Sequence, residues 1–168
     1  PRDVDQLRLT DLAGLPQLRS IRVLDHRLKA QHIDLSIPPG QPIEQVQIVA
    51  DHFDPAPLAG SPTLTYITLA GNTEPFSVAA LANLPNLVKL DLAEARVADI
   101  ASIAAFPALR VLTLNAHQWD QLFTSGWTPT QLAAAAVAGH ATVAESARWL
   151  AAIHGPDHPA PQIRTIHG

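Results

Sequence analysis

The chain of 168 residues is 47% hydrophobic and carries a formal net charge of -4 at neutral pH. A chain of this length can bury enough apolar surface to form one domain or one short repeat array. The negative charge argues against a nucleic-acid partner, because such binding needs a basic surface that displaces counterions. No apolar run approaches the roughly twenty residues of a membrane-spanning helix, so we expect no membrane partner.

The sequence has no cysteine, which excludes disulfides, thiolate nucleophiles and cysteine ligands for metals. It also lacks methionine and begins with Pro1, so we expect a fragment, such as the C-terminal part of a longer protein. No signal-peptide pattern follows Pro1, which is uninformative in a fragment. We predict a cytoplasmic location.

Five segments share the pattern L-x-x-L-x-L, with leucine, isoleucine or valine at the apolar positions, and begin 25, 21, 23 and 22 positions apart. A recurring spacing of this size is typical of repeat proteins, in which each unit contributes a short strand and a return segment. One unit cannot cover its own apolar side chains, so the units must stack with their strands in a parallel sheet. The segments are Leu18-Ile21-Val23, Ile43-Val46-Ile48, Leu64-Ile67-Leu69, Leu87-Leu90-Leu92 and Leu109-Leu112-Leu114.

A proline recurs in register with four of these segments, two residues before the first apolar position. Because proline breaks the interior of a helix, the recurrence excludes one continuous helix. The stretches are "LAGLPQL", "LAGSPTL", "LANLPNL" and "IAAFPAL".

These features make roughly residues 12–123 resemble a leucine-rich repeat array. The resemblance is closest in "LVKLDLAEARVADIASIAAFPALRVLTL", which is similar to the bacterial type with repeats of about 22 residues. It implies an α/β fold, namely a short right-handed leucine-rich repeat solenoid with a parallel sheet on its concave face and a C-terminal helical cap. We predict that the array spans residues 1–123, with about five repeats and an irregular first repeat.

The resemblance also implies an asparagine at the ninth position of each repeat, where its amide bonds to backbone groups of the turn. Only Asn72 conforms, so we expect an irregular curvature. Polar residues at this position would lie along one edge of the sheet and bond to the turns, which would make His26 and Asp51 near neighbours. The other residues at this position are His26, Asp51, Ala95 and His117.

The first repeat lacks the usual return segment. In its place, "HIDLSIP" alternates Ile33, Leu35 and Ile37 with other residues. This alternation predicts an extra short strand on the convex side.

The last unit of a stack exposes an apolar flank that terminal structure must cover. We predict that residues 124–155 form a helical hairpin with this role. Its first helix would begin at Thr128–Pro129 and end at Gly139, and its second would begin at a capping box of Thr142 and Glu145. An alternative role for the hairpin is to dock a partner.

The remaining residues, 156–168, are rich in proline and are predicted to form a flexible tail. The alternative is that Ile163 and Ile166 fold back onto the body of the protein. We also expect Trp119, Trp127 and Trp149 to pack where the C-terminal cap meets the repeat array.

Side chains in a strand point alternately to opposite faces of the sheet. With positions one, four and six of each unit buried, positions three and five should form two outward-facing rows. We predict that these rows bind a partner, with Tyr66 as the aromatic anchor, although a solvated face without a ligand is the alternative. The predicted binding residues are Ser20, Arg22, Gln45, Gln47, Tyr66, Thr68, Lys89, Asp91, Val111 and Thr113.

Catalysis and metal binding receive little support from the sequence. It contains no G-x-S-x-G elbow, phosphate-binding glycine loop or H-E-x-x-H motif. The stretch "DHFD" at 51–54 places two carboxylates around His52 at a turn, and His154, Asp157 and His158 lie in the predicted flexible tail, which gives no rigid geometry. A zinc site needs three or four ligands held in fixed positions. We therefore expect no enzyme, metal, cofactor or small-molecule substrate.

Two hypotheses about function remain. The first is a protein-protein interaction module that binds a protein or peptide through the concave sheet face. The alternative is a structural or regulatory repeat domain that packs against a missing N-terminal domain, which could be an enzyme. Under this alternative, Val4, Leu7 and Leu9 should form an exposed apolar end.

Overall fold

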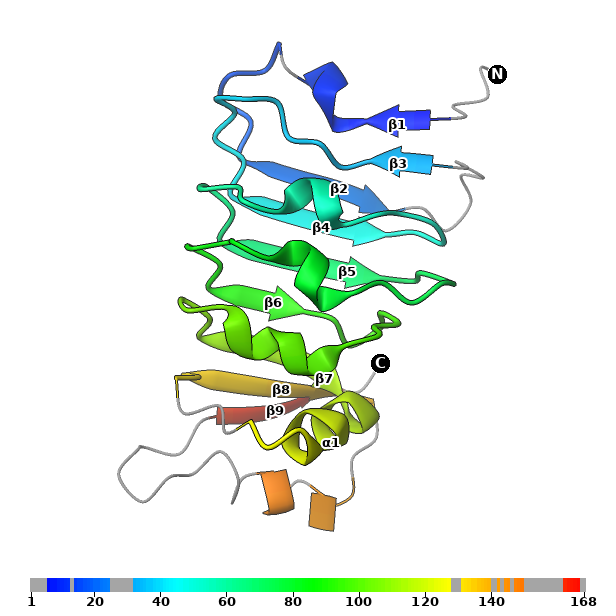
Figure 1. The fold of residues 1–168 in the computed structure, drawn as a ribbon, viewed down its shortest axis with the longest axis vertical. Helices are drawn as coiled ribbons and strands as arrows, with labels where there is room; N and C mark the ends of the chain where they lie inside the picture. Colours follow the sequence, from blue (N-terminus) through cyan, green and yellow to red (C-terminus); the bar gives the residue numbers. More distant parts are fainter. Residues whose placement is uncertain are drawn as a thin grey trace.

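A computed structural model describes residues 6–12, 14–24, 32–127, 131–139, 142, 144–145, 147–149 and 162–166. The structure is α/β and is dominated by one parallel sheet of seven strands in the order β2-β4-β5-β6-β7-β8-β9 (Figure 1). The strands are β2 (Ser20–Leu24), β4 (Gln45–Val49), β5 (Tyr66–Ala70), β6 (Lys89–Asp91), β7 (Val111–Asn115), β8 (Ala134–Ala138) and β9 (Gln162–Ile166).

The segments that return from one strand to the next cover one face of this sheet (Figure 1). Three of them contain short 3-10 helices, and neighbouring helices contact one another along the stack. A separate parallel pair of strands, β1 and β3, belongs to the first return segments. These elements are β1 (Gln6–Arg8), η1 (Leu9–Leu12), β3 (His32–Asp34), η2 (Ala56–Leu58), η3 (Val78–Leu81) and η4 (Ile100–Ala105).

The predicted apolar positions line up in buried columns. The fourth positions of the five units are Cα partners across neighbouring strands, and each is at most 7% exposed. Burying one such aliphatic side chain stabilises the fold by about 1.5–3 kcal/mol. The prediction of parallel strands that stack to bury aliphatic columns is confirmed. This column consists of Ile21, Val46, Ile67, Leu90 and Leu112.

The predicted extra strand in "HIDLSIP" is confirmed as β3. Ile33 of this strand is buried, and so is Leu35, which lies just after the strand. Its partner is β1, which the repeat pattern does not predict. Leu9, which follows β1, is 1% exposed.

Side chains that cross between units satisfy the backbone of the turns. The buried Asn72 amide nitrogen donates to the carbonyl oxygens of Glu74 and Arg96 at 2.7 and 2.8 Å, and its oxygen accepts from the Arg96 N–H at 3.0 Å. These bonds confirm the role expected of a ninth-position asparagine. Where Ala95 replaces asparagine, Gln118 of the next unit donates to the Ala95 and Leu92 carbonyls, both at 2.9 Å. His26 lies outside the described residues.

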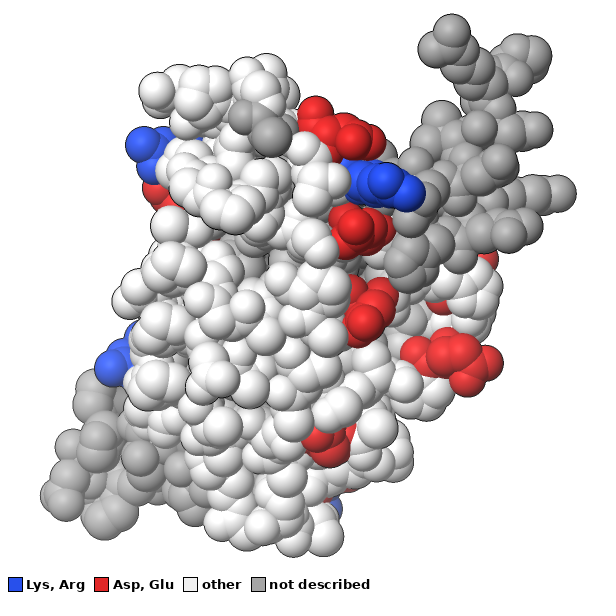
Figure 2. All heavy atoms as spheres, turned by 45° about the horizontal axis from the view of Figure 1, so that its top comes forward, with Lys and Arg blue, Asp and Glu red and all other residues white. Residues whose placement is uncertain are grey.

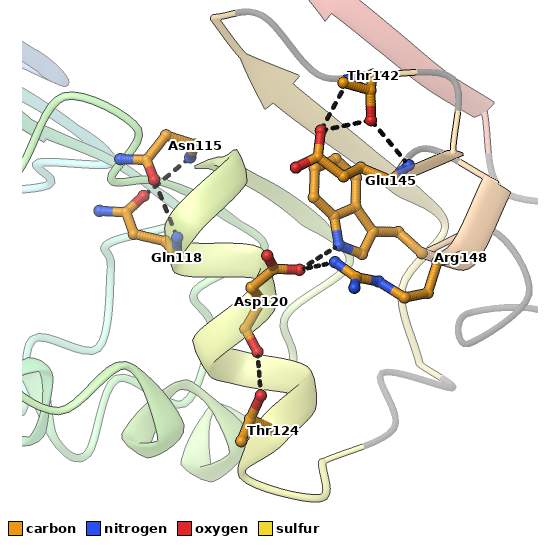
Figure 3. A network of polar contacts seen from close by, with 8 residues as sticks. Asn115, Gln118, Asp120, Thr124, Thr142, Glu145 and Arg148 are labelled. Carbon is orange, nitrogen blue, oxygen red and sulfur yellow. Dashed lines mark hydrogen bonds and ion pairs between the residues drawn. The ribbon is translucent and has the colours of Figure 1, made fainter.

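Helix α1 (Ala116–Thr124) lies where the repeat pattern predicts a turn at His117. It begins with a capping box in which Asn115 accepts a hydrogen bond from the Gln118 N–H and the Gln118 side chain accepts one from the Asn115 N–H, each at 2.9 Å (Figure 3). The spacing N-x-x-Q in the sequence is the signal for this helix start.

The predicted first helix of the C-terminal hairpin is wrong, because β8 occupies Ala134–Ala138. An alanine-rich segment has a high helix propensity. Here, however, Ala135 and Val137 are buried in register with Leu112 and Leu114 of β7. A helix in this place would leave one edge of β7 without backbone partners, so tertiary contacts override propensity.

The capping box predicted for the second helix is confirmed. The Thr142 hydroxyl accepts from the Glu145 N–H at 3.2 Å, and the Glu145 carboxylate accepts from the Thr142 N–H at 2.8 Å (Figure 3). Residues 144–145 and 147–149 are helical. The Trp149 indole is buried and donates to the Asp120 carboxylate of α1 at 3.0 Å, which joins this segment to the repeat units.

The predicted flexible tail is wrong for the part that the structure describes. Residues 162–166 form β9, which pairs in parallel with β8, so the fold-back alternative holds for them. The predicted helix start at Thr128–Pro129 lies outside the described residues. Within the described part of the chain, no helix has both the length and the apolar character needed to cross a membrane.

Candidate functional site

Ten residues that the sequence analysis predicts to face outward lie in two rows on the sheet face opposite the return segments. We call this surface the row face. In each row, residues on neighbouring strands are Cα partners, and they alternate along each strand with the buried aliphatic columns. The first row is Ser20, Gln45, Tyr66, Lys89 and Val111, and the second is Arg22, Gln47, Thr68, Asp91 and Thr113.

Exposure differs along the row face. Ser20, Arg22 and Gln45 are exposed, and most of the later residues are half-buried. Thr68 and Thr113 are only 9% and 6% exposed. The two threonines lie in the predicted row but are shielded from solvent, because longer side chains on the same face can cover a short one.

Tyr66 is held in place from two sides. The Lys89 ammonium nitrogen lies 4.3 Å from the centroid of the Tyr66 ring, which is a cation–π contact. The Thr68 hydroxyl donates to the Tyr66 oxygen at 3.0 Å. Because these contacts order the ring in the free protein, Tyr66 would lose little conformational freedom on binding a partner. Its own O–H can still donate a hydrogen bond.

Asp91 is the acidic residue of the row face. Burial raises the pKa of the Asp91 carboxyl, and this effect outweighs the hydrogen bond from the Ala93 N–H at 3.2 Å and the nearby positive charge of Lys89, which lower it. The ionised carboxylate is therefore poorly hydrated. A cation supplied by a partner would compensate for that lost hydration.

The rows extend onto β8, which the sequence analysis did not include among the binding residues. Ala134 is the Cα partner of Val111, and Ala136 is the partner of Thr113. The signal for this sixth strand is Leu132-x-x-Ala135-x-Val137, which begins 23 residues after Leu109. Small side chains at this end make the row face less polar than at β2.

Several hollows lie away from the row face, and two of them contain more than one polar side chain. One, of about 320 Å³, is lined by residues 37–42 and several residues between Pro57 and Thr63. The other, of about 480 Å³, lies between η4 and α1 and includes Asp99, His117 and Asp120.

The two carboxylates of the larger hollow already have partners. Asp120 binds Arg148 and the Trp149 indole (Figure 3). Asp99 accepts from the Ser77 and Ser102 hydroxyls and from two backbone N–H groups of η3. Burial alone would raise the pKa of Asp99, but these hydrogen bonds lower it overall. The hollow therefore offers little free acidic chemistry to a ligand.

Among the described residues, no group of three histidine or acidic side chains could hold a metal ion. In the stretch "DHFD", Asp51, His52 and Asp54 are exposed, and His52 Nδ1 lies 3.3 Å from the Thr73 hydroxyl. His154, Asp157 and His158 lie outside the described residues. Figure 2 shows a face on which acidic side chains recur along the molecule but most of the surface is uncharged.

The sequence matches no protein-family model, and the comparisons with curated proteins and with solved structures give no match. A proposal about function therefore rests on the repeat pattern and the geometry of the row face. Among the surfaces described, the row face alone combines aligned polar residues with an ordered aromatic side chain.

Proposed function

We propose that this chain is a leucine-rich repeat protein that binds a protein or peptide partner through the row face. In this proposal the units wind as a short right-handed solenoid, in keeping with the handedness of nearly all parallel crossover connections. The row face is its concave side, and the segment from α1 to β9 closes its C-terminal end. The proposal includes no catalytic activity, cofactor or small-molecule substrate, and the cytoplasmic location remains part of it.

The observation that carries the proposal is the alignment of the row face around Tyr66. Ordered aromatic residues provide contact area at a small entropic cost, which is why they dominate many protein interfaces. The surrounding glutamine, threonine and charged side chains suit a polar partner better than an apolar one. Their rigid sheet support means that a partner meets a preformed surface.

A capture experiment tests this function. Wild-type protein is compared with a Tyr66→Ala, Arg22→Ala double variant and with a Glu74→Ala, Gln121→Ala control, in which the replaced residues are exposed and lie outside the rows. We expect a partner that wild type and control retain and that the row-face variant loses, with all three proteins melting at similar temperatures. Equal capture by all three proteins would contradict the proposal.

A second candidate function is the packing of this repeat domain against another domain. Two of the exposed large hydrophobic residues, Leu15 and Leu24, lie in the first units and are each 51% exposed. No strand among the described residues pairs with the outer edge of β2. Leu9 is buried, however, and Val4 lies outside the described residues. A Leu15→Ser, Leu24→Ser variant would lose this docking and keep capture through the row face.

A further inference from the structure

The second row of the row face carries two opposite charges, and their strands are separated by two other strands of the sheet. Arg22 lies on β2 and Asp91 on β6, and the residues aligned between them, Gln47 and Thr68, are uncharged. Within the described part of the chain, Arg22 has no hydrogen bond or ion pair, and its side chain is exposed. Its guanidinium group is therefore available to a partner.

Lys89 does not neutralise Asp91 by a direct ion pair, as far as the described residues show. Its ammonium group lies over the Tyr66 ring instead. The Asp91 carboxylate is half-buried and receives one hydrogen bond from the Ala93 N–H. A basic side chain that approaches this carboxylate would replace hydration that burial has removed.

The spacing of the two charges matches an extended peptide that crosses the strands. Three strand spacings of about 4.8 Å place the backbones of Arg22 and Asp91 about 14 Å apart. Four residues of an extended chain rise about 13 Å, and an even spacing directs both side chains to the same face. A spacing of three or five residues would direct one of them away from the sheet. Gln47 lies on the path and Gln45 lies beside it in the first row, and their amides can both donate to and accept from a peptide backbone.

We propose that the row face recognises an extended peptide in which an acidic and a basic side chain are four residues apart, the acidic one at Arg22 and the basic one at Asp91. This inference rests on the proposed function and gives the chemistry of its partner. The peptide backbone would cross β4 at Gln47 and pass beside Tyr66.

The test measures the affinities of three synthetic peptides for each protein at low salt. The peptides are uncharged except at two positions four residues apart. These two positions carry glutamate and lysine, two lysines, or two glutamates. Wild type should bind the mixed peptide about fivefold more tightly than either other peptide, because each of the other peptides exchanges one attraction for a repulsion. Moving the lysine to a spacing of three should lower the affinity of the mixed peptide.

Charge reversal in the protein should change the preferred peptide. Arg22→Glu should favour the two-lysine peptide, and Asp91→Lys should favour the two-glutamate peptide. Arg96→Glu, which makes the same charge change in an exposed turn outside the rows, should keep the preference of wild type. Because Arg22 is exposed, its variant remains informative even where Asp91→Lys lowers stability.

The proposed peptide recognition would be overturned if Arg22→Glu kept the wild-type order of preference among the three peptides. It would also be overturned if wild type bound none of the three peptides measurably. Either result leaves the proposed function standing if the Tyr66→Ala, Arg22→Ala variant still loses its captured partner. If that variant keeps the partner, the proposed function fails with it. The two failures are therefore distinguishable.

Discussion

Asn72 joins backbone groups of two successive turns through one buried side chain. Both hydrogens of its amide and one lone pair of its oxygen are used, and two of the three bonds reach the next unit at Arg96. A buried backbone group that loses its partner costs about 1–3 kcal/mol. Much of the local cohesion between these two units therefore depends on one residue.

We expect Asn72→Ala to lower the free energy of unfolding by about 2–3 kcal/mol, because it removes three hydrogen bonds to partly buried backbone groups. The measurement is chemical denaturation monitored by circular dichroism. Asn86→Ala is the matched control, since Asn86 is exposed and makes a single bond to the Pro62 carbonyl at 2.7 Å. A loss for Asn72→Ala no larger than that of the control would contradict this account.

The side chains of Tyr66, Lys89 and Thr68 form one connected group. Each is placed by the alternation of its strand, but the contact between the Lys89 ammonium and the Tyr66 ring depends on the register of β5 with β6. The row face is therefore ordered by pairs of residues on different strands rather than by any residue alone.

At the scale of elements, the return segments are joined by Asp99. It precedes η4, yet it accepts from the N–H groups of Val78 and Ala79 and from the Ser77 hydroxyl, all at the start of η3. The N-terminal N–H groups of a helix have no partner within the helix, and a carboxylate is a strong acceptor for them. One unit thus caps the helix of the unit before it.

This cap predicts a dependence of stability on pH. The pKa of Asp99 in the folded protein is lowered below its ordinary value of 3.8. Its stabilising contribution is therefore fully present above the unfolded-state pKa and is lost as the pH falls through the lower folded-state pKa. We expect Asp99→Asn to be less stable than wild type at neutral pH and to lose less stability on acidification. The measurement is the urea midpoint of both proteins between about pH 5 and pH 2.

Parallel curves for the two proteins over this range would show that Asp99 does not carry the effect. Asp99→Ala provides a second measurement at neutral pH. It removes every acceptor of the cap and should cost about 1–2 kcal/mol, as other cap substitutions do.

The whole molecule is a stack in which each strand of the large sheet contacts its neighbours in the stack. The sheet order follows the chain order, so strands in the middle have partners on both sides, whereas β2 and β9 are the terminal strands of the sheet. In the solenoid proposed above, stability would be close to the sum of the units and their nearest-neighbour interfaces. Local opening should therefore begin at the ends.

We predict that backbone amides of β5, β6 and β7 exchange with deuterium more slowly than those of β2 and β9. Val137→Ala, at a buried position of β8, should accelerate exchange in β8 and β9 and leave β4 and β5 nearly unchanged. Mass spectrometry of exchanged peptides measures both effects. Equal acceleration in all strands would mean that the molecule opens as one cooperative unit.

The strand positions and the two rows could be predicted because they depend on local alternation. The aliphatic side chains at the fourth and sixth positions of each unit must be buried, and the residue between them must then point the other way. The burial of Thr68 and Thr113 could not be predicted in this way, because it depends on the height of side chains on other strands. Sequence spacing also does not predict that Gln118 bonds to the turn at Ala95 in place of an asparagine, because the two residues belong to different units.

The spacing of side chains along the chain is therefore enough to locate the five strands of the large sheet from β2 to β7, the residues that they bury and the residues of the two rows. The C-terminal end depends instead on contacts between distant segments. The alanine-rich segment before Gly139 suits a helix and a strand alike, and the open edge of β7 selects the strand because its backbone N–H and C=O groups need partners.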